Sequence, residues 1–167
     1  MPKLVTTFLT IPLAAFLIFA ACVGAFIFAF TMQYGFDVKP CILCLWQRVP
    51  FALAGIAALM AALWEPYGKQ TRLLLFLCAL MFFINSGVSV FHTGVERHWW
   101  LGTSGCAITP LHGSAPEDLR QQLLHTVVAR CDVISWTFLG LSMANWNVPF
   151  CLALAVFSLL AALYQKR

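Results

Sequence analysis

Two cysteines separated by two residues carry the clearest chemistry in this sequence. They lie in the segment Cys41-Ile42-Leu43-Cys44, and Arg48 follows one helical turn later. At 3.6 residues per turn, Cys41, Cys44 and Arg48 share one face of a helix. A Cys-x-x-Cys pair at a helix N-terminus beside a cation has one thiol of lowered pKa, and the thiolate is the reactive form. The segment therefore predicts a redox-active dithiol.

A second pair of cysteines, Cys106 and Cys131, lies further along the chain. All four sulfurs together would suit a structural zinc site, although such sites usually combine two short-spaced ligand pairs. Two static disulfides, one of them closing a long loop, are a second interpretation. A relay of thiol–disulfide exchange is the third, and it also accounts for the cation beside the first pair. We expect the relay and no metal.

Hydrophobic segments must position these cysteines. Of the 167 residues, 62% are hydrophobic and 10% are charged, whereas soluble domains average about 45–50% and about 25%. This composition excludes a soluble globular domain and predicts an integral membrane protein. The net charge of +4 comes from scattered cations rather than a basic stripe, so we expect no nucleic-acid partner.

Four apolar stretches are long enough to cross a bilayer as helices. They cover about residues 13–33, 44–64, 73–92 and 146–164. We expect a single all-α membrane domain over residues 1–167, built as a four-helix bundle. Pro149 falls in the first turn of the fourth stretch, where its missing N–H costs little. Cys22, Cys78 and Cys151 lie mid-span, where thiols behave as small hydrophobic groups.

The cations predict the orientation of the four spans. Four spans place both termini on one side, and the short segments there carry Lys3, Lys69, Arg72, Lys166 and Arg167. The positive-inside rule makes that side cytoplasmic. Loops at about residues 34–43 and 93–145 then lie outside, where disulfides persist. Residues 116–130 of the long loop have amphipathic spacing and predict a short helix lying on the membrane.

The chain resembles the DsbB family of bacterial inner-membrane disulfide bond formation proteins. The resemblance covers nearly the whole chain. It rests on the string KPCILC at residues 39–44, on Gln47 and Arg48 after it, and on WTFLGLSM at residues 136–143. Vitamin K epoxide reductases also combine four spans with two cysteine pairs, but their loop pair precedes the Cys-x-x-Cys.

This resemblance implies a thiol:quinone oxidoreductase of the inner membrane. It would reoxidise a DsbA-like periplasmic thioredoxin-fold protein and pass the electrons to a membrane quinone, either ubiquinone or menaquinone. The partner would attack Cys106, and Cys131 would be the disulfide mate of Cys106. Cys41 would exchange with Cys131, and Cys44 would contact the quinone. Arg48 would stabilise the Cys44 thiolate and the reduced quinone.

His92, at the outer end of the third span, is the candidate for a further quinone contact. An interfacial histidine bonded to backbone or water is the alternative. Three other functions stay open at this point. These alternatives are a thiolate metal-binding membrane protein, a structural subunit with passive disulfides, and a paralogue that serves a specialised DsbA-like partner.

Overall fold

The computed structural model describes residues 11–64, 68–103, 106 and 130–164. Its four long helices are α2 (Ile11–Phe30), α3 (Ile42–Leu63), α4 (Lys69–Glu96) and α6 (Met143–Leu163). Each is long and apolar enough to cross a membrane. The prediction of an all-α protein with four membrane spans is therefore confirmed. The amphipathic helix predicted at residues 116–130 falls outside the described residues, apart from Arg130.

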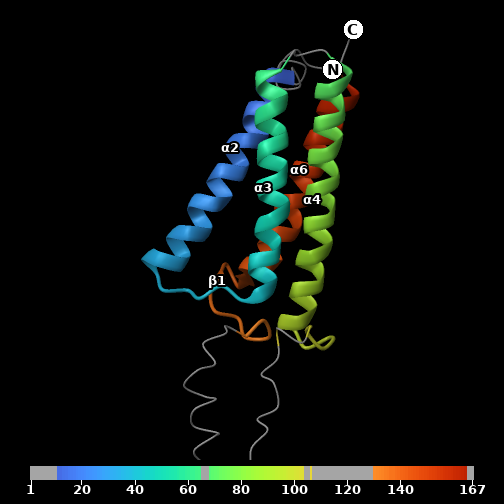
Figure 1. The fold of residues 1–167 in the computed structure, drawn as a ribbon. Helices are drawn as coiled ribbons and strands as arrows, with labels where there is room; N and C mark the ends of the chain where they lie inside the picture. The colour runs from blue at the N-terminus through green and yellow to red at the C-terminus, as the bar shows by residue number, and fades with distance from the viewer. Residues whose placement is uncertain (1–10, 65–67, 104–105, 107–129, 165–167) are drawn as a thin grey trace, which may run out of the picture.

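The helices form a bundle in which α3 packs against α2 and α4, and α4 packs against α6. Figure 1 shows that the start of α2, the end of α3, the start of α4 and the end of α6 share one end of the bundle. The opposite end carries the start of α3, the end of α4 and the start of α6. We call this the site end, because the candidate functional residues named above meet there.

Small side chains make up most of the buried core between the helices. Close packing of small residues drives helix association in a membrane, where lipid removes the usual hydrophobic drive. Gly55 approaches α2 so closely that an added Cβ would lie 3.3 Å from the Cβ of Cys22. The alanines of this core on α3 and α6 are Ala54, Ala57, Ala58, Ala61, Ala155, Ala161 and Ala162.

Helix α6 starts earlier than the sequence suggested. Ser142 caps it by accepting a hydrogen bond from the backbone N–H of Asn145. Pro149 is consequently the seventh residue of α6, counted from Met143, so its prediction in the first turn is wrong. At this depth a proline removes the helical hydrogen bond to the carbonyl of Asn145.

A two-residue turn precedes α6 and folds the chain back over the site end. Strands β1 (Thr137–Phe138) and β2 (Leu141–Ser142) pair antiparallel. The turn residues Leu139 and Gly140 both have positive φ angles, 52° and 77°, as tight hairpin turns of this length require. The indole N–H of Trp146 donates to the carbonyl of Phe138 at 3.0 Å. This bond ties the hairpin to the first turn of α6.

Candidate active site

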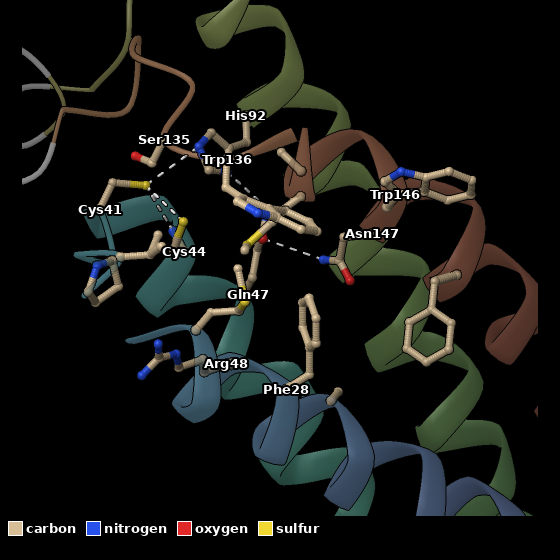
Figure 2. A pocket seen from close by; sticks show the side chains of 18 of the residues that line it. Phe28, Cys41, Cys44, Gln47, Arg48, His92, Ser135, Trp136, Trp146 and Asn147 are labelled. Carbon is tan, nitrogen blue, oxygen red and sulfur yellow. Dashed lines mark hydrogen bonds between the residues drawn. The ribbon is translucent and has the colours of Figure 1, made fainter. Parts of the chain in front are cut away.

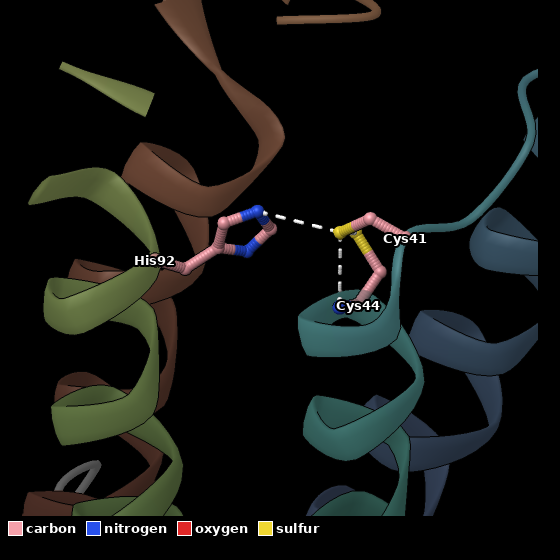
Figure 3. Close-up of side chains that lie close together, drawn as sticks. All are labelled: Cys41, Cys44 and His92. Carbon is pink, nitrogen blue, oxygen red and sulfur yellow. Dashed lines mark hydrogen bonds between the residues drawn. The ribbon is translucent and has the colours of Figure 1, made fainter. Parts of the chain in front are cut away.

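The Cys-x-x-Cys segment lies at the N-terminus of α3, with its first cysteine as the helix cap. The Cys41 sulfur accepts a hydrogen bond from the backbone N–H of Cys44 at 3.4 Å. The Cys41 thiol donates to the Cys44 sulfur across 3.0 Å (Figure 3). Free N–H groups and the helix dipole favour negative charge at this end of a helix. The location therefore favours a thiolate on the dithiol, the form that attacks disulfides.

His92 approaches the dithiol from the neighbouring helix α4. Its Nε2 lies 3.5 Å from the Cys41 sulfur, and its Nδ1 lies 3.4 Å from the side-chain nitrogen of Gln47. Glu96, one turn further along α4, places a carboxylate oxygen 3.8 Å from Nε2. Ser142 donates a hydrogen bond to Glu96. The imidazole is 3% exposed, so it belongs to the buried cysteine site rather than to the membrane surface.

A line of polar side chains continues from His92 into the bundle. Gln47 accepts a hydrogen bond from the side-chain nitrogen of Asn147 at 3.4 Å. The same nitrogen lies 2.8 Å from the hydroxyl oxygen of Ser89. Because these residues come from α3, α6 and α4, their bonds connect three helices. Buried polar groups need such partners, and here the partners also fix the orientation of the imidazole.

The second cysteine pair lies against the first. Cys106 and Cys131 are 3% and 1% exposed. Cys131 packs with Cys41, Leu43 and Cys106 in one cluster, and its thiol interacts with the thiols of Cys106 and Cys41. The backbone N–H of Cys106 donates a hydrogen bond to the carbonyl of Thr103 at 2.7 Å. Cys41, Cys106 and Cys131 therefore form one buried cluster, and the partly buried Cys44 packs against it.

Burial and mutual hydrogen bonds keep two of these thiols protonated. The hydrogen bond with Cys44, followed by burial, raises the pKa of the Cys41 thiol to about 12. The pKa of the Cys131 thiol is also raised, mainly by burial and to a smaller extent by its interaction with Cys106. Both thiols are consequently neutral at pH 7 in the reduced cluster. All seven cysteines belong to the described residues, and each is free in this structure.

Arg48 faces α2 rather than the thiols. Its guanidinium donates to the side-chain oxygen of Gln33 at 2.8 Å and lies 5.2 Å from the ring centroid of Phe30. Gln33 belongs to a short wider helical turn, η1 (Thr31–Gly35), that continues α2. The guanidinium therefore bonds to a neutral amide in this structure, and stabilisation of the Cys44 thiolate by Arg48 stays a prediction.

A cavity of about 750 Å³ adjoins the cluster (Figure 2). Its wall is mostly apolar, with contributions from α2, α3, α6 and the hairpin. The rings of Phe28 and Trp136 meet edge to face across it, with centroids 6.3 Å apart. The polar groups of its lining include Cys44, Arg48 and His92. Such a site suits a flat apolar ligand that carries a few polar atoms.

The family model for disulfide bond formation protein DsbB matches residues 12–161. Disulfide bond formation protein B of Xylella fastidiosa strain Temecula1 is 33% identical over 156 residues, which cover 89% of this chain and 88% of the relative. The protein of the same name from Hahella chejuensis is 32% identical over 141 residues, which cover 80% of this chain and 82% of that relative. No solved structure matches the chain.

The chain belongs to the DsbB family. It is a multi-pass membrane protein, and the family assigns it a role in disulfide bond formation. In this DsbB-family chain, the four cysteines chosen from the sequence meet in one cluster. The other two chosen residues, Arg48 and His92, lie on the cavity beside that cluster.

The site of this DsbB-family member also contains residues to which the sequence had given no role. Gln47 contacts the imidazole, Glu96 flanks it, and Asn147 supports Gln47. Two local signals point to them. Gln47 lies three residues after Cys44 on the same helix face, and Glu96 is four residues after His92. Asn147 is a polar residue near the start of an apolar span, which marks a functional or packing contact.

Proposed function

We propose that this protein is a thiol:quinone oxidoreductase that regenerates a periplasmic, DsbA-like disulfide donor. One observation carries the proposal: Cys131 packs with Cys41 and Cys106 in one buried cluster, and its thiol interacts with both of theirs, so the two pairs are in direct contact. Thiol–disulfide exchange needs a thiolate in contact with the sulfur that it attacks. Electrons can therefore pass from the loop pair to the Cys-x-x-Cys.

In the first exchange, a thiolate of the reduced partner attacks Cys106 of a Cys106–Cys131 disulfide. A mixed disulfide forms, and Cys131 leaves as a thiolate. The second thiol of the partner then displaces Cys106. The partner leaves oxidised, and the loop pair has gained two electrons.

In the second exchange, Cys131 attacks Cys41 of a Cys41–Cys44 disulfide and releases the Cys44 thiolate. Cys106 then displaces Cys41 and restores the loop disulfide. The two electrons now reside on the Cys41 and Cys44 pair. The N-terminal N–H groups of α3 stabilise the negative charge that the released sulfur carries.

The cavity fits a quinone headgroup. Its volume of about 750 Å³ lies in the usual range of about 300–1,000 Å³ for ligand sites. Its apolar wall suits the ring, and Arg48, His92 and Gln47 offer hydrogen-bonding groups for the two carbonyl oxygens. When bound, a quinone would supply the two-electron acceptor, so Cys41 and Cys44 would return to their disulfide and give up two protons to the quinone oxygens.

Two of these side chains, Arg48 and His92, would also manage the charge and the protons of this ligand. Arg48, already oriented by Gln33, supplies a permanent positive charge for the oxygen that becomes anionic. His92 lies 3.5 Å from the Cys41 sulfur and also lines the cavity, so it is placed to pass a proton. The aromatic wall excludes water, which strengthens both interactions.

We further propose that the site end faces the periplasm across a bacterial inner membrane. Lys69 and Arg72 begin α4 at the opposite end of the bundle, and positive charges of this kind mark the cytoplasmic side. A membrane-impermeant maleimide applied to intact spheroplasts should label a cysteine introduced at exposed Leu139, and not one introduced at exposed Lys69. The reverse pattern would contradict this orientation.

The function is tested by mixing the detergent-purified protein, at limiting concentration, with a reduced thioredoxin-fold partner and a soluble quinone. Quinone absorbance should fall over many turnovers. Cys106→Ala should abolish turnover, whereas Cys22→Ala, which changes a mid-bundle cysteine, should leave it intact. Absence of turnover with several partners and quinones would overturn the proposal.

A further inference from the structure

Three ligand-type side chains meet at the start of α3. The Cys41 sulfur lies 3.0 Å from the Cys44 sulfur and 3.5 Å from His92 Nε2 (Figure 3). All three atoms lie within 4.8 Å of one another. In a tetrahedral zinc site, bond lengths of 2.0–2.3 Å put ligand atoms about 3.5–3.8 Å apart. Shifts of under about 1 Å would therefore complete such a site.

We propose that the reduced protein binds a thiophilic divalent cation, with Zn²⁺ the best match, through Cys41, Cys44 and His92. Two thiolates and one imidazole are a ligand set that Zn²⁺ favours. Binding holds both sulfurs as thiolates and releases to the buffer the protons that they still carry, and no electron moves. The oxidised protein has a disulfide in place of two ligands, so it does not form the site.

The surroundings of His92 suit a metal ligand. A cation on Nε2 leaves the ring proton on Nδ1, which then needs an acceptor. Gln47 faces Nδ1 at 3.4 Å, and rotating its amide turns the side-chain oxygen toward that proton. Asn147, which bonds to the other end of this amide, can rotate in the same way. The Glu96 carboxylate, 3.8 Å from Nε2, adds negative charge beside the cation.

The site differs from the four-sulfur alternative that the sequence left open. That alternative used Cys106 and Cys131 as ligands, whereas the ligand atoms here come from α3 and α4 alone. Three protein ligands leave a fourth position for water. The consequence for the proposed function is inhibition, because sulfurs held by Zn²⁺ are withdrawn from exchange with Cys131.

The test uses the full-length reduced protein in detergent, with Co²⁺ as a spectroscopic substitute for Zn²⁺. We expect one Co²⁺ per chain, thiolate-to-cobalt absorption and the visible bands of a tetrahedral site, all lost on adding Zn²⁺. Cys44→Ser and His92→Gln should remove these bands. Gln47→Leu should weaken binding by about 10–100-fold, as loss of a supporting hydrogen bond does elsewhere. The matched controls, His98→Asn at an exposed histidine and Cys106→Ser in the loop pair, should bind normally.

Three results would overturn the proposal. They are equal binding by oxidised protein, unchanged bands in His92→Gln, and loss of binding in Cys106→Ser, which would instead support a four-sulfur site. Binding is read without turnover, so it stands or fails independently of the proposed function. Only the inhibition rests on that function: one equivalent of Zn²⁺ should slow quinone reduction, and a chelator should restore it. Undiminished turnover when the site is fully occupied by Zn²⁺ would refute the inhibition, but it would not refute the metal site itself.

Discussion

The seven cysteines fall into two groups with different surroundings. Cys22, Cys78 and Cys151 lie in the middle of the bundle, in a core of mostly small apolar residues, where Cys151 also hydrogen-bonds to Asn85 and Asn147. Cys78 donates to the carbonyl of Ala54, as a small side chain filling a helix interface does. At the site end, by contrast, the neighbours of the cysteines include other cysteines, an imidazole and a helix N-terminus. The same thiol is thus a packing group in one place and, in the function that we propose, a reactive group in the other.

The largest expected difference between the groups is in turnover. Cys44→Ser should reduce quinone reduction to background, because the serine hydroxyl cannot form the disulfide that the relay needs. Cys78→Ser, the same change in the middle of the bundle, should retain turnover per folded molecule. The assay is steady-state quinone absorbance with a reduced partner. Normal turnover in Cys44→Ser would remove that residue from the electron path.

The second expectation concerns the response of Cys41 to pH. Its raised pKa of about 12 keeps the thiol protonated, so its thiolate fraction should rise about tenfold per pH unit from pH 7 to 10. An ordinary thiol, with a pKa of about 8.5, levels off above about pH 9.5. The alkylation rate of Cys41 in reduced protein is quantified on its peptide by mass spectrometry. In the folded protein this rate should keep rising up to pH 10. In the denatured protein the rate should level off above about pH 9.5, as for an ordinary thiol. A plateau below pH 10 in the folded protein would contradict the raised pKa of Cys41.

Size, rather than chemistry, should matter for the mid-bundle cysteines. Cys22→Leu should lower the free energy of unfolding by about 1–3 kcal/mol, the usual cost of overpacking, because Gly55 leaves little room beside it. Cys22→Ala is the matched control and should cost less. Both are measured by unfolding in mixed detergent micelles. Equal stability of the two variants would show that the helices separate easily at this point.

A pair of arginines extends the comparison to the two ends of the bundle. Arg48 and Arg72 both lie over phenylalanine rings, at 5.2 Å and 5.7 Å, but only Arg48 lines the cavity. Arg48→Ala should raise the KM for quinone by about tenfold, equivalent to about 1.4 kcal/mol. Arg72→Ala should leave KM unchanged. An identical KM in both variants would exclude Arg48 from the quinone site.

Much of the fold was predictable because its signals are local. Apolar runs of about 20 residues specify spans, and the spacing from Cys41 to Cys44 places both on the first turn of a helix. Contacts between helices were not predictable in this way. Nothing in the sequence around His92 indicates that it meets Cys41, 51 positions away, or that Asn147 supports Gln47.

Arg48 shows that sequence spacing can also suggest a contact that the packing of the helices does not favour. Helical spacing puts it on the face of Cys41 and Cys44, yet its long side chain turns toward Gln33 on the adjoining helix. A flexible cation follows the nearest hydrogen-bond acceptor and aromatic face, which only the packing of α2 on α3 determines. Pro149 was misplaced for a related reason, because the cap at Ser142 depends on the hairpin before it.

The contact between Cys131 and Cys41 is the central claim, and disulfide trapping tests it most directly. In the double variant Cys44→Ser/Cys106→Ser, these two cysteines lack their usual partners. Mild oxidation should then join them, and non-reducing peptide mapping should recover a Cys41–Cys131 bridge in most molecules. Recovery of both cysteines as free thiols, under conditions that fully oxidise the wild-type protein, would contradict the direct relay.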